Sequence, residues 1–368
     1  MNSTTWVRLA AIAAAVSLSL GIYNSSSNEV QAQSGHQGVG TPKFQVDPFW
    51  PKPLPNHWVT GGIGGVCVDA QDHVFILTHG DLNEAEQKIA TAAPAVIEFD
   101  PDGQVVNSWG DRDVLPGREL HGCFVDYQGN VWISGSQDGI VQKYPHDGSK
   151  MLLQIGTRGT FDSSDGTAKG TATNSSHASL NGPTSVAVDA ANGDVYIADG
   201  YRNRRVAVFD RSGKFLRQWG RKATEAETHA GVGGVFQEVV HCVAIGNDGL
   251  IYVCDRWGDR IEVFDKMGNF QRNILLESKT AVPTGAAGWI AFSPDQAQQF
   301  MYVAEYGDDA ISVVDRATGK TLTSLGRPGH QAGELSDPHM VIVDSKGDIV
   351  VGESVHGRRV QMFRFVGN

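Results

Sequence analysis

Short apolar runs alternate with polar, glycine-rich turns along the chain after residue 60, and one phrase recurs six times. It consists of an apolar strand, a polar turn and a second apolar strand that ends in an acidic or small residue. The copies cover residues 65–77, 123–133, 186–199, 243–255, 290–305 and 341–353. Strand pairs repeated in this way indicate an all-β protein.

Most copies of the phrase are followed by two further strands. The third strand is clearest at residues 205–210 and 260–265. The fourth ends in Trp-Gly or a similar pair, at residues 109–110, 155–156, 219–220 and 325–326. Four short strands per unit are typical of a β-propeller blade. Six units therefore predict a six-bladed β-propeller with four-stranded blades.

The last blade is incomplete, because the chain ends after a third strand at residues 359–365. We expect residues 43–46 to supply the missing outer strand and close the ring. The propeller then spans residues 61–368, after an N-terminal segment at 33–60. Residues 81–93 form a helix-prone insertion in blade 1, and composition favours solvated loops for the polar stretches 159–179 and 221–237.

The first residues have the pattern of a secretory signal. Arg8 precedes an apolar run at residues 9–23, and a small-residue site at 30–32 follows. The run is too short to span a bilayer with margin. We expect residues 1–32 to be a signal peptide cleaved after Ala32, and the protein to be secreted or periplasmic. An uncleaved membrane anchor is the weaker alternative.

The composition narrows the classes of partner. Of the 368 residues, 40% are hydrophobic and 19% are charged, which is enough apolar material for a large core. The net charge of -11 argues against binding to nucleic acid phosphates or to an anionic membrane surface. We therefore expect a monomer whose partner is a small molecule or a peptide.

The four cysteines are Cys67, Cys123, Cys242 and Cys254. An even number in an exported chain permits two disulfides. All four lie inside apolar strand patterns, however, where buried free thiols are common. We expect free thiols. Cys242 and Cys254 are the one pair on the two arms of a single predicted hairpin.

Three histidines stand at the same place in three of the six repeats. His121, His241 and His339 begin the first strands of blades 2, 4 and 6, and the odd blades carry small residues there: Gly64, Thr184 and Gly288. First strands line the central channel of a propeller, so the three imidazoles should meet on the axis. Three histidines with a vacant position describe a catalytic zinc site. The alternative is that each histidine bonds backbone and binds nothing.

The loops after the second strands open on the same side as the histidines. They bring Tyr201 in blade 3 and Arg256 in blade 4 to the predicted mouth, together with residues 78–81 and 305–309. A tyrosine near a divalent cation ionises more readily and can act as a base. An arginine can hold a substrate carboxylate through two parallel hydrogen bonds.

From about Gly61 to Phe365 the chain resembles the NHL-repeat propeller of peptidyl-α-hydroxyglycine α-amidating lyase. The resemblance is carried by residues 120–122, 199–206, 240–241, 255–256 and 338–339. It implies that His121, His241 and His339 bind Zn²⁺, that Tyr201 is the catalytic tyrosine, and that Arg256 is an active-site arginine. The implied reaction cleaves a carbinolamide C–N bond and releases an amide and glyoxylate.

The chain departs from that family at three positions. His79 stands where the family has an arginine, and so takes that place in the catalytic set. Met340 stands where the family has an aspartate that helps to hold a structural Ca²⁺, so we expect this calcium site to be lost or rebuilt. Arg202 replaces a disulfide cysteine of the tyrosine loop.

Two other functions remain open at this stage. One is a different zinc-dependent hydrolase or lactonase on the same propeller, with a metal-activated water as the nucleophile. The other is a non-catalytic NHL-repeat binding module. The enzyme hypotheses require a bound metal, whereas the binding module requires none.

Overall fold

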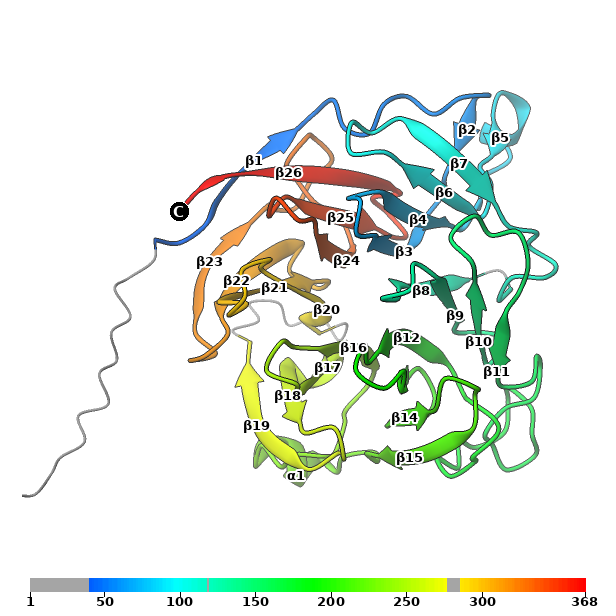
Figure 1. Ribbon diagram of the computed structural model, residues 1–368, viewed down its shortest axis with the longest axis vertical. Coiled ribbons are helices and arrows are strands. Elements are labelled where there is room, and N and C mark those ends of the chain that lie inside the picture. Colours follow the sequence, from blue (N-terminus) through cyan, green and yellow to red (C-terminus); the bar gives the residue numbers. More distant parts are fainter. Residues whose placement is uncertain (1–39, 118, 277–284) are drawn as a thin grey trace, which may run out of the picture. The chain divides into compact units, whose positions relative to one another are not determined.

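The computed structural model describes residues 40–117, 119–276 and 285–368, and in them six four-stranded antiparallel sheets surround a common centre (Figure 1). The predicted six-bladed propeller is confirmed. Blade 1 contains β3 (Ile63–Val68), β4 (Val74–Thr78), β6 (Val96–Phe99) and β7 (Val105–Trp109). Blade 2 contains β8 (Leu120–Val125), β9 (Val131–Gly135), β10 (Ile140–Tyr144) and β11 (Leu153–Ile155). Blade 3 contains β12 (Pro183–Val188), β13 (Val195–Asp199), β14 (Arg205–Phe209) and β15 (Phe215–Trp219).

Blades 4 to 6 repeat this order and complete the ring. Blade 4 contains β16 (Val240–Ile245), β17 (Ile251–Asp255), β18 (Arg260–Phe264) and β19 (Phe270–Leu275). Blade 5 contains β20 (Ala287–Phe292), β21 (Phe300–Glu305), β22 (Ala310–Asp315) and β23 (Thr321–Leu325). Blade 6 contains β24 (Pro338–Val343), β25 (Ile349–Glu353), β26 (Arg359–Gly367) and β1 (Lys43–Asp47). β1 pairs antiparallel with β26, so a strand from the start of the described chain completes the last blade.

The core lies between neighbouring blades, because both faces of each sheet are covered. One apolar cluster joins blades 3 and 4 through Val208, Val253 and Phe264, all essentially without solvent exposure. In blades 3 and 4 the acidic residue that ends the second strand is buried as well, and it pairs with the arginine that starts the third strand. The ion pairs Asp199–Arg205 and Asp255–Arg260 are both 2.9 Å long, so each buried carboxylate has a compensating charge.

The insertions are more ordered than composition indicates. Residues 81–93 form a 3₁₀ turn, η1 (Glu86–Lys88), and a short strand, β5 (Thr91–Ala92), which pairs with β2 (Trp58–Val59). In the polar stretch 159–179, Asp162 is buried and accepts hydrogen bonds from Ser175 and Asn203. Residues 221–237 contain the five-residue α1 (Glu225–His229) and bury Phe236. Buried anchors, which composition does not reveal, hold these stretches to the blades.

The cysteine prediction is wrong. Cys67 forms a disulfide with Cys123, and Cys242 forms one with Cys254. The second pair joins opposite residues of β16 and β17. The first joins β3 and β8, the inner strands of neighbouring blades, with Cα atoms 5.3 Å apart. Adjacent inner strands therefore come within disulfide reach of each other, although 56 residues separate the two cysteines in sequence.

The predicted signal peptide, residues 1–32, lies outside the described residues. Among the helices that are described, none has the length and apolar character required for a bilayer crossing.

Candidate metal centre

Each of the six inner strands has a bulge at its start, and the three histidines occupy it. The pairing with the second strand skips between the first and third residues of β3, β12, β16, β20 and β24, and β8 has the same extra residue. His121, His241 and His339 are the second residues of β8, β16 and β24. A bulge frees a residue from the ladder and turns its side chain, here toward the propeller axis.

The three imidazoles meet there. We call His121, His241 and His339 the axial triad. Their ring centroids are 4.6, 4.8 and 4.9 Å apart, and the rings stand at 75–81° to one another. One nitrogen from each lies within 4.8 Å of the others, and all three side chains are buried. This group can hold a metal ion.

Backbone carbonyls of the odd blades orient the rings. His121 Nδ1 lies 2.7 Å from the Thr184 carbonyl oxygen, and His241 Nδ1 lies 2.6 Å from that of Gly288. An Nδ1–H that donates to a carbonyl leaves the Nε2 lone pair free for a metal. Burial lowers the pKa of His339 and the Gly64 carbonyl opposes this only weakly, since within the described residues its Nδ1 has no hydrogen-bond partner. The histidine of each even blade thus interacts with the backbone carbonyl of the small residue in the next blade.

The small size of those residues has a steric cause at Gly64. A Cβ atom added there would lie 1.8 Å from the Leu120 carbonyl oxygen and 2.7 Å from His79 Nε2. A larger residue would therefore push against the strand that carries His121. The alternation of histidine and small residue is a packing requirement as well as a ligand pattern.

Burial keeps the axial triad uncharged. It lowers the pKa of His121 to about 3, and the Arg256 charge acts in the same direction. The pKa values of His241 and His339 are also well below that of an exposed histidine, again chiefly because of burial. Neutral imidazole is the form that binds a metal, so the ligands are in the right state at neutral pH.

Tyr201 lies directly beside two of the histidines. Its hydroxyl oxygen is 3.0 Å from His121 Nε2 and 3.4 Å from His241 Nε2. The residue follows β13, and its backbone N–H donates to the Gly182 carbonyl at 2.9 Å. Burial raises the pKa of Tyr201, while the charge of Arg256 lowers it. A cation held by the Nε2 atoms would lie next to the phenol oxygen.

Arg256 covers the same mouth from η2 (Arg256–Gly258). Its guanidinium carbon is 5.9 Å from the ring centroid of Tyr201 and 5.3 Å from that of Tyr306. It is 9% exposed, and within the described part of the chain its Nε has no hydrogen-bond acceptor. A buried charged donor without a partner is costly unless a ligand supplies an acceptor.

His79 and Met340 take positions that differ from a simple ligand role. His79 Nε2 lies 3.2 Å from the Leu120 carbonyl oxygen, beside the strand start that carries His121. Its charge contributes to lowering the pKa values of His121 and His339. Met340 is fully buried in the apolar core and offers no hard oxygen to a calcium ion.

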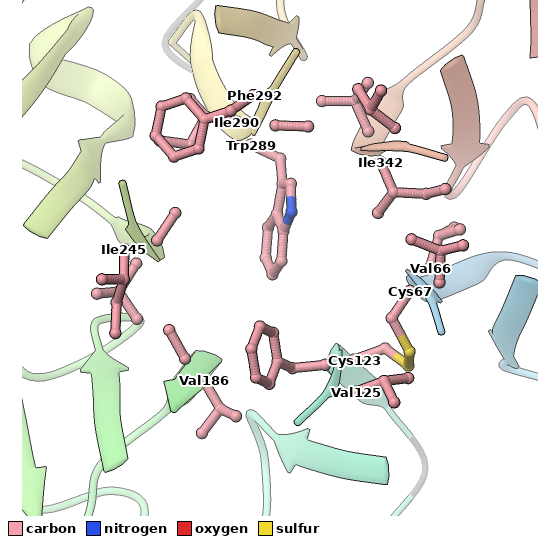
Figure 2. Close-up of a pocket in the computed structure, with 18 of the residues that line it drawn as sticks. Val66, Cys67, Cys123, Val125, Val186, Ile245, Trp289, Ile290, Phe292 and Ile342 are labelled. Atoms are coloured by element: carbon pink, nitrogen blue, oxygen red, sulfur yellow. A yellow bond between two sulfur atoms is a disulfide. The ribbon is translucent and has the colours of Figure 1, made fainter. Parts of the chain in front are cut away.

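Two aromatic residues of this region were not named in the predicted catalytic set, although the loop 305–309, which contains the first of them, was expected at the mouth. Tyr306 lies 6.0 Å from His339, between ring centroids, and directly follows β21. The strand register aligns it with Arg256, which directly follows β17. Trp289 lies 6.2 Å from His241. It follows the bulge residue of β20 and points into the channel (Figure 2).

Beyond Trp289 the channel becomes apolar. A cavity of about 250 Å³ is lined by the later residues of the inner strands, including Val66, Val186, Ile245 and Ile342, and by the disulfide of Cys67 (Figure 2). The polar groups thus gather at the end of the channel where Tyr201 and Arg256 lie. A second pocket, lined by Glu119, Gln137 and Tyr201 among others, opens at that end.

Comparison with known proteins supports the repeat assignment. Residues 180–209 match the NHL repeat family. Rat peptidylglycine alpha-amidating monooxygenase is 24% identical over 80% of this chain and 29% of its own length. Mouse NHL repeat-containing protein 3 is 26% identical over 88% of this chain and 84% of its own. Drosophila melanogaster peptidyl-alpha-hydroxyglycine alpha-amidating lyase 2 is 34% identical over 54% and 49%.

The chain matches only part of the amidating enzymes among these relatives. The chain spans less than a third of the rat monooxygenase and about half of the fly lyase. Among solved structures, a streptogramin B lyase has a TM-score of 0.55 at 12% identity, over 88% of this chain and 98% of that one. Likeness at such identity shows the fold alone.

Proposed function

We propose that this chain, a six-bladed β-propeller with an NHL repeat match at residues 180–209, is an exported, zinc-dependent carbon–nitrogen lyase that cleaves a carbinolamide to an amide and glyoxylate. One observation carries the proposal: the hydroxyl oxygen of Tyr201 lies within 3.4 Å of the free nitrogens of two of three converging histidines. Similarity to amidating lyases of low to moderate identity supports the choice of reaction.

The axial triad fits zinc by its chemistry. Three neutral imidazoles, two of them oriented by backbone carbonyls, form the ligand set of a catalytic zinc site with an open position. Carboxylate-rich sites for calcium would have a different composition. When bound, the ion supplies a Lewis acid that makes a neighbouring hydroxyl group easier to deprotonate.

Tyr201 would act as the base. As a phenolate it takes the proton of the carbinol hydroxyl, and the positive charge of Arg256 favours this ionised form. The O–H electron pair becomes the carbonyl bond of glyoxylate, and the C–N bond breaks. The proton then passes from Tyr201 to the departing amide nitrogen, so the tyrosine returns to its starting state.

Arg256 and His79 would serve binding and positioning. Arg256 would offer to the substrate carboxylate its Nε, which has no acceptor within the described residues. His79 Nε2 is engaged with the Leu120 carbonyl. We assign it a positioning role on the strand that carries His121, in place of the second guanidinium that the resemblance implies.

The test combines metal content with product. Elemental analysis of the purified full chain should find zinc that is lost in His241→Ala, and an α-hydroxyglycine peptide should release glyoxylate. Protein whose zinc content is the same in wild type and His241→Ala would contradict the metal centre. Zinc without glyoxylate release would contradict the lyase and favour a hydrolase. Metal-free native protein would favour the binding module.

A further inference from the structure

A second group of metal-ligating side chains lies between blades 1 and 2, at the opposite strand ends from the axial triad. We call Asp69, His73, Glu98 and His146 the seam cluster. Asp69 follows β3 and His73 precedes β4, while Glu98 lies in β6. These three belong to blade 1. His146 follows β10 of blade 2 and reaches across the seam.

The contacts within the seam cluster are short. His146 Nε2 lies 2.8 Å from Asp69 Oδ2 and 3.8 Å from Glu98 Oε1. One ligand atom from each of these three residues lies within 4.8 Å of the others. His73 Nδ1 lies 2.6 Å from Glu98 Oε1. The carboxylate side chains are 2% and 4% exposed, whereas that of His146 is 40% exposed.

Among the six blades, blade 1 alone has a carboxylate at the position of Glu98. The strand register places it opposite Phe75, and the same register gives the equivalent residue of each third strand. Those residues are Lys143, Val208, Val263, Val313 and Met362. Four blades thus bury an apolar side chain where blade 1 buries a carboxylate. Burial of a carboxylate is costly without a compensating charge.

His146 occupies a second position, three residues beyond that register point, where blades 4 and 5 have a cation. In blade 4 this position is Lys266, which pairs with Asp189 of blade 3 at 2.5 Å. In blade 5 it is Arg316, which pairs with Asp248 of blade 4 at 2.5 Å. These are permanent cations that bridge two blades. The seam of blades 1 and 2 has an imidazole instead, which can offer a lone pair to a metal.

Both features fall on the same seam. Blade 1 contributes a carboxylate that the other blades lack, and blade 2 contributes an imidazole where blades 4 and 5 have a permanent cation. Within the described residues, no lysine or arginine forms an ion pair with Asp69 or Glu98. The pair of carboxylates and the imidazole that faces them therefore suit a divalent cation at the place of the missing ammonium group.

We propose that the seam cluster is a second metal site, in which Asp69, Glu98 and His146 bind a divalent transition-metal ion of the zinc class. Two oxygens and one nitrogen are a mixed ligand set that zinc accepts, and the exposure of His146 leaves room for water. His73 bonds to Glu98 and positions it. The ion joins blades 1 and 2 near the disulfide of Cys67, and its role is structural.

The decisive variants restore what other blades contain. His146→Lys installs the cation of the blade 3–4 seam, and Glu98→Val installs the residue of blade 3, so both should fold. Apo protein prepared by chelation is titrated with Zn²⁺ by calorimetry, and bound metal is counted after dialysis. We expect two zinc equivalents in wild type and one in each variant, with the affinity of the lost site falling by at least about 100-fold.

A His241→Ala background separates the two sites. There the seam is tested alone, and zinc should raise Tm in that variant but not in His241→Ala/His146→Lys. Lys266→His is the matched control, because it places an imidazole against Asp189 without a second carboxylate and should bind no additional zinc. Equal zinc stoichiometry in wild type, His146→Lys and Glu98→Val would overturn the proposal and leave the cluster as an ion-paired contact.

Discussion

The axial triad and the seam cluster use the same repeat in opposite ways. The triad places one residue type at one position of alternate blades, and its three rings lie within 4.9 Å of one another on the axis. The seam cluster collects different residue types from four positions in two neighbouring blades. The triad is buried and offers only nitrogen ligands, whereas the seam cluster offers both oxygen and nitrogen ligands and is partly exposed.

The difference follows from what each location must do. On the axis, symmetry brings equivalent positions together, so three neutral ligands converge without burying any net charge. At a seam, only two blades meet, and a polar contact must balance charges between them. Elsewhere in the ring a lysine or arginine achieves this balance. A metal ion can do the same for carboxylates and imidazole, which is why we propose a structural role for the seam cluster and a catalytic role for the axial triad.

The largest expected effect separates the two sites. His241→Ala should remove the axial metal and lower kcat/KM by more than about 1000-fold, because the Lewis acid is lost together with one of its three ligands. His146→Lys should leave kcat/KM within about twofold of wild type, since the seam does not touch substrate. Glyoxylate release and zinc content measured on the same samples check this. Loss of activity in His146→Lys with the axial zinc retained would contradict a purely structural role for the seam cluster.

Tyr201→Phe tests whether catalysis takes place at the axial triad. The phenol oxygen touches two triad nitrogens, so its removal takes away the proposed base but no metal ligand. We expect kcat to fall by about 100- to 10,000-fold, the usual range for general acid–base groups, with zinc content unchanged. Single-turnover assays would show this. Tyr306→Phe is the matched control. A wild-type rate in Tyr201→Phe would show that Tyr201 is not the base.

The neutral state of the triad predicts a pH effect on the metal-free protein. Burial lowers the pKa of His121 to about 3, from the ordinary value of 6.5. The unfolded chain therefore takes up the proton first, and stability is lost as pH falls from 6.5 toward 3. At pH 5 the loss from this one residue is about 2 kcal/mol, or about 30-fold in the folding equilibrium.

Urea unfolding at pH 7.5 and pH 5 in the presence of a chelator measures this dependence. His121→Gln should flatten it by about that amount, and His330→Gln, at an exposed position, is the control. A pH dependence that is identical in wild type and His121→Gln would show that the axial imidazoles are not the source.

The smallest expected effect concerns substrate binding. Arg256→Lys keeps the charge near Tyr201 but replaces a planar donor group by a point charge. We expect KM for an α-hydroxyglycine peptide to rise about tenfold, which corresponds to the loss of one charge-assisted hydrogen bond, while kcat changes less. Steady-state kinetics check this. An unchanged KM would show that the unpartnered Nε does not face the carboxylate.

Repeats made much of the molecule predictable. The six-bladed fold and the approach of Tyr201 to the histidines both follow from equivalent positions in successive copies. The Cys67–Cys123 disulfide did not, because we compared cysteines within one hairpin and not between adjacent inner strands. Glu98 was missed for a related reason: in a single copy it is an ordinary strand residue. Its significance appears when the register shows valine at the same place in other blades.

The sequence by itself determined the number of blades and which residues share a position, because strand periodicity and turn residues are local properties. Only the tertiary structure decided which atoms meet. It turned His121 Nδ1 to the Thr184 carbonyl, left Arg256 Nε without an acceptor and set His146 against two carboxylates. These outcomes depend on contacts between chain segments far apart in sequence, whose geometry is settled by packing around the ring.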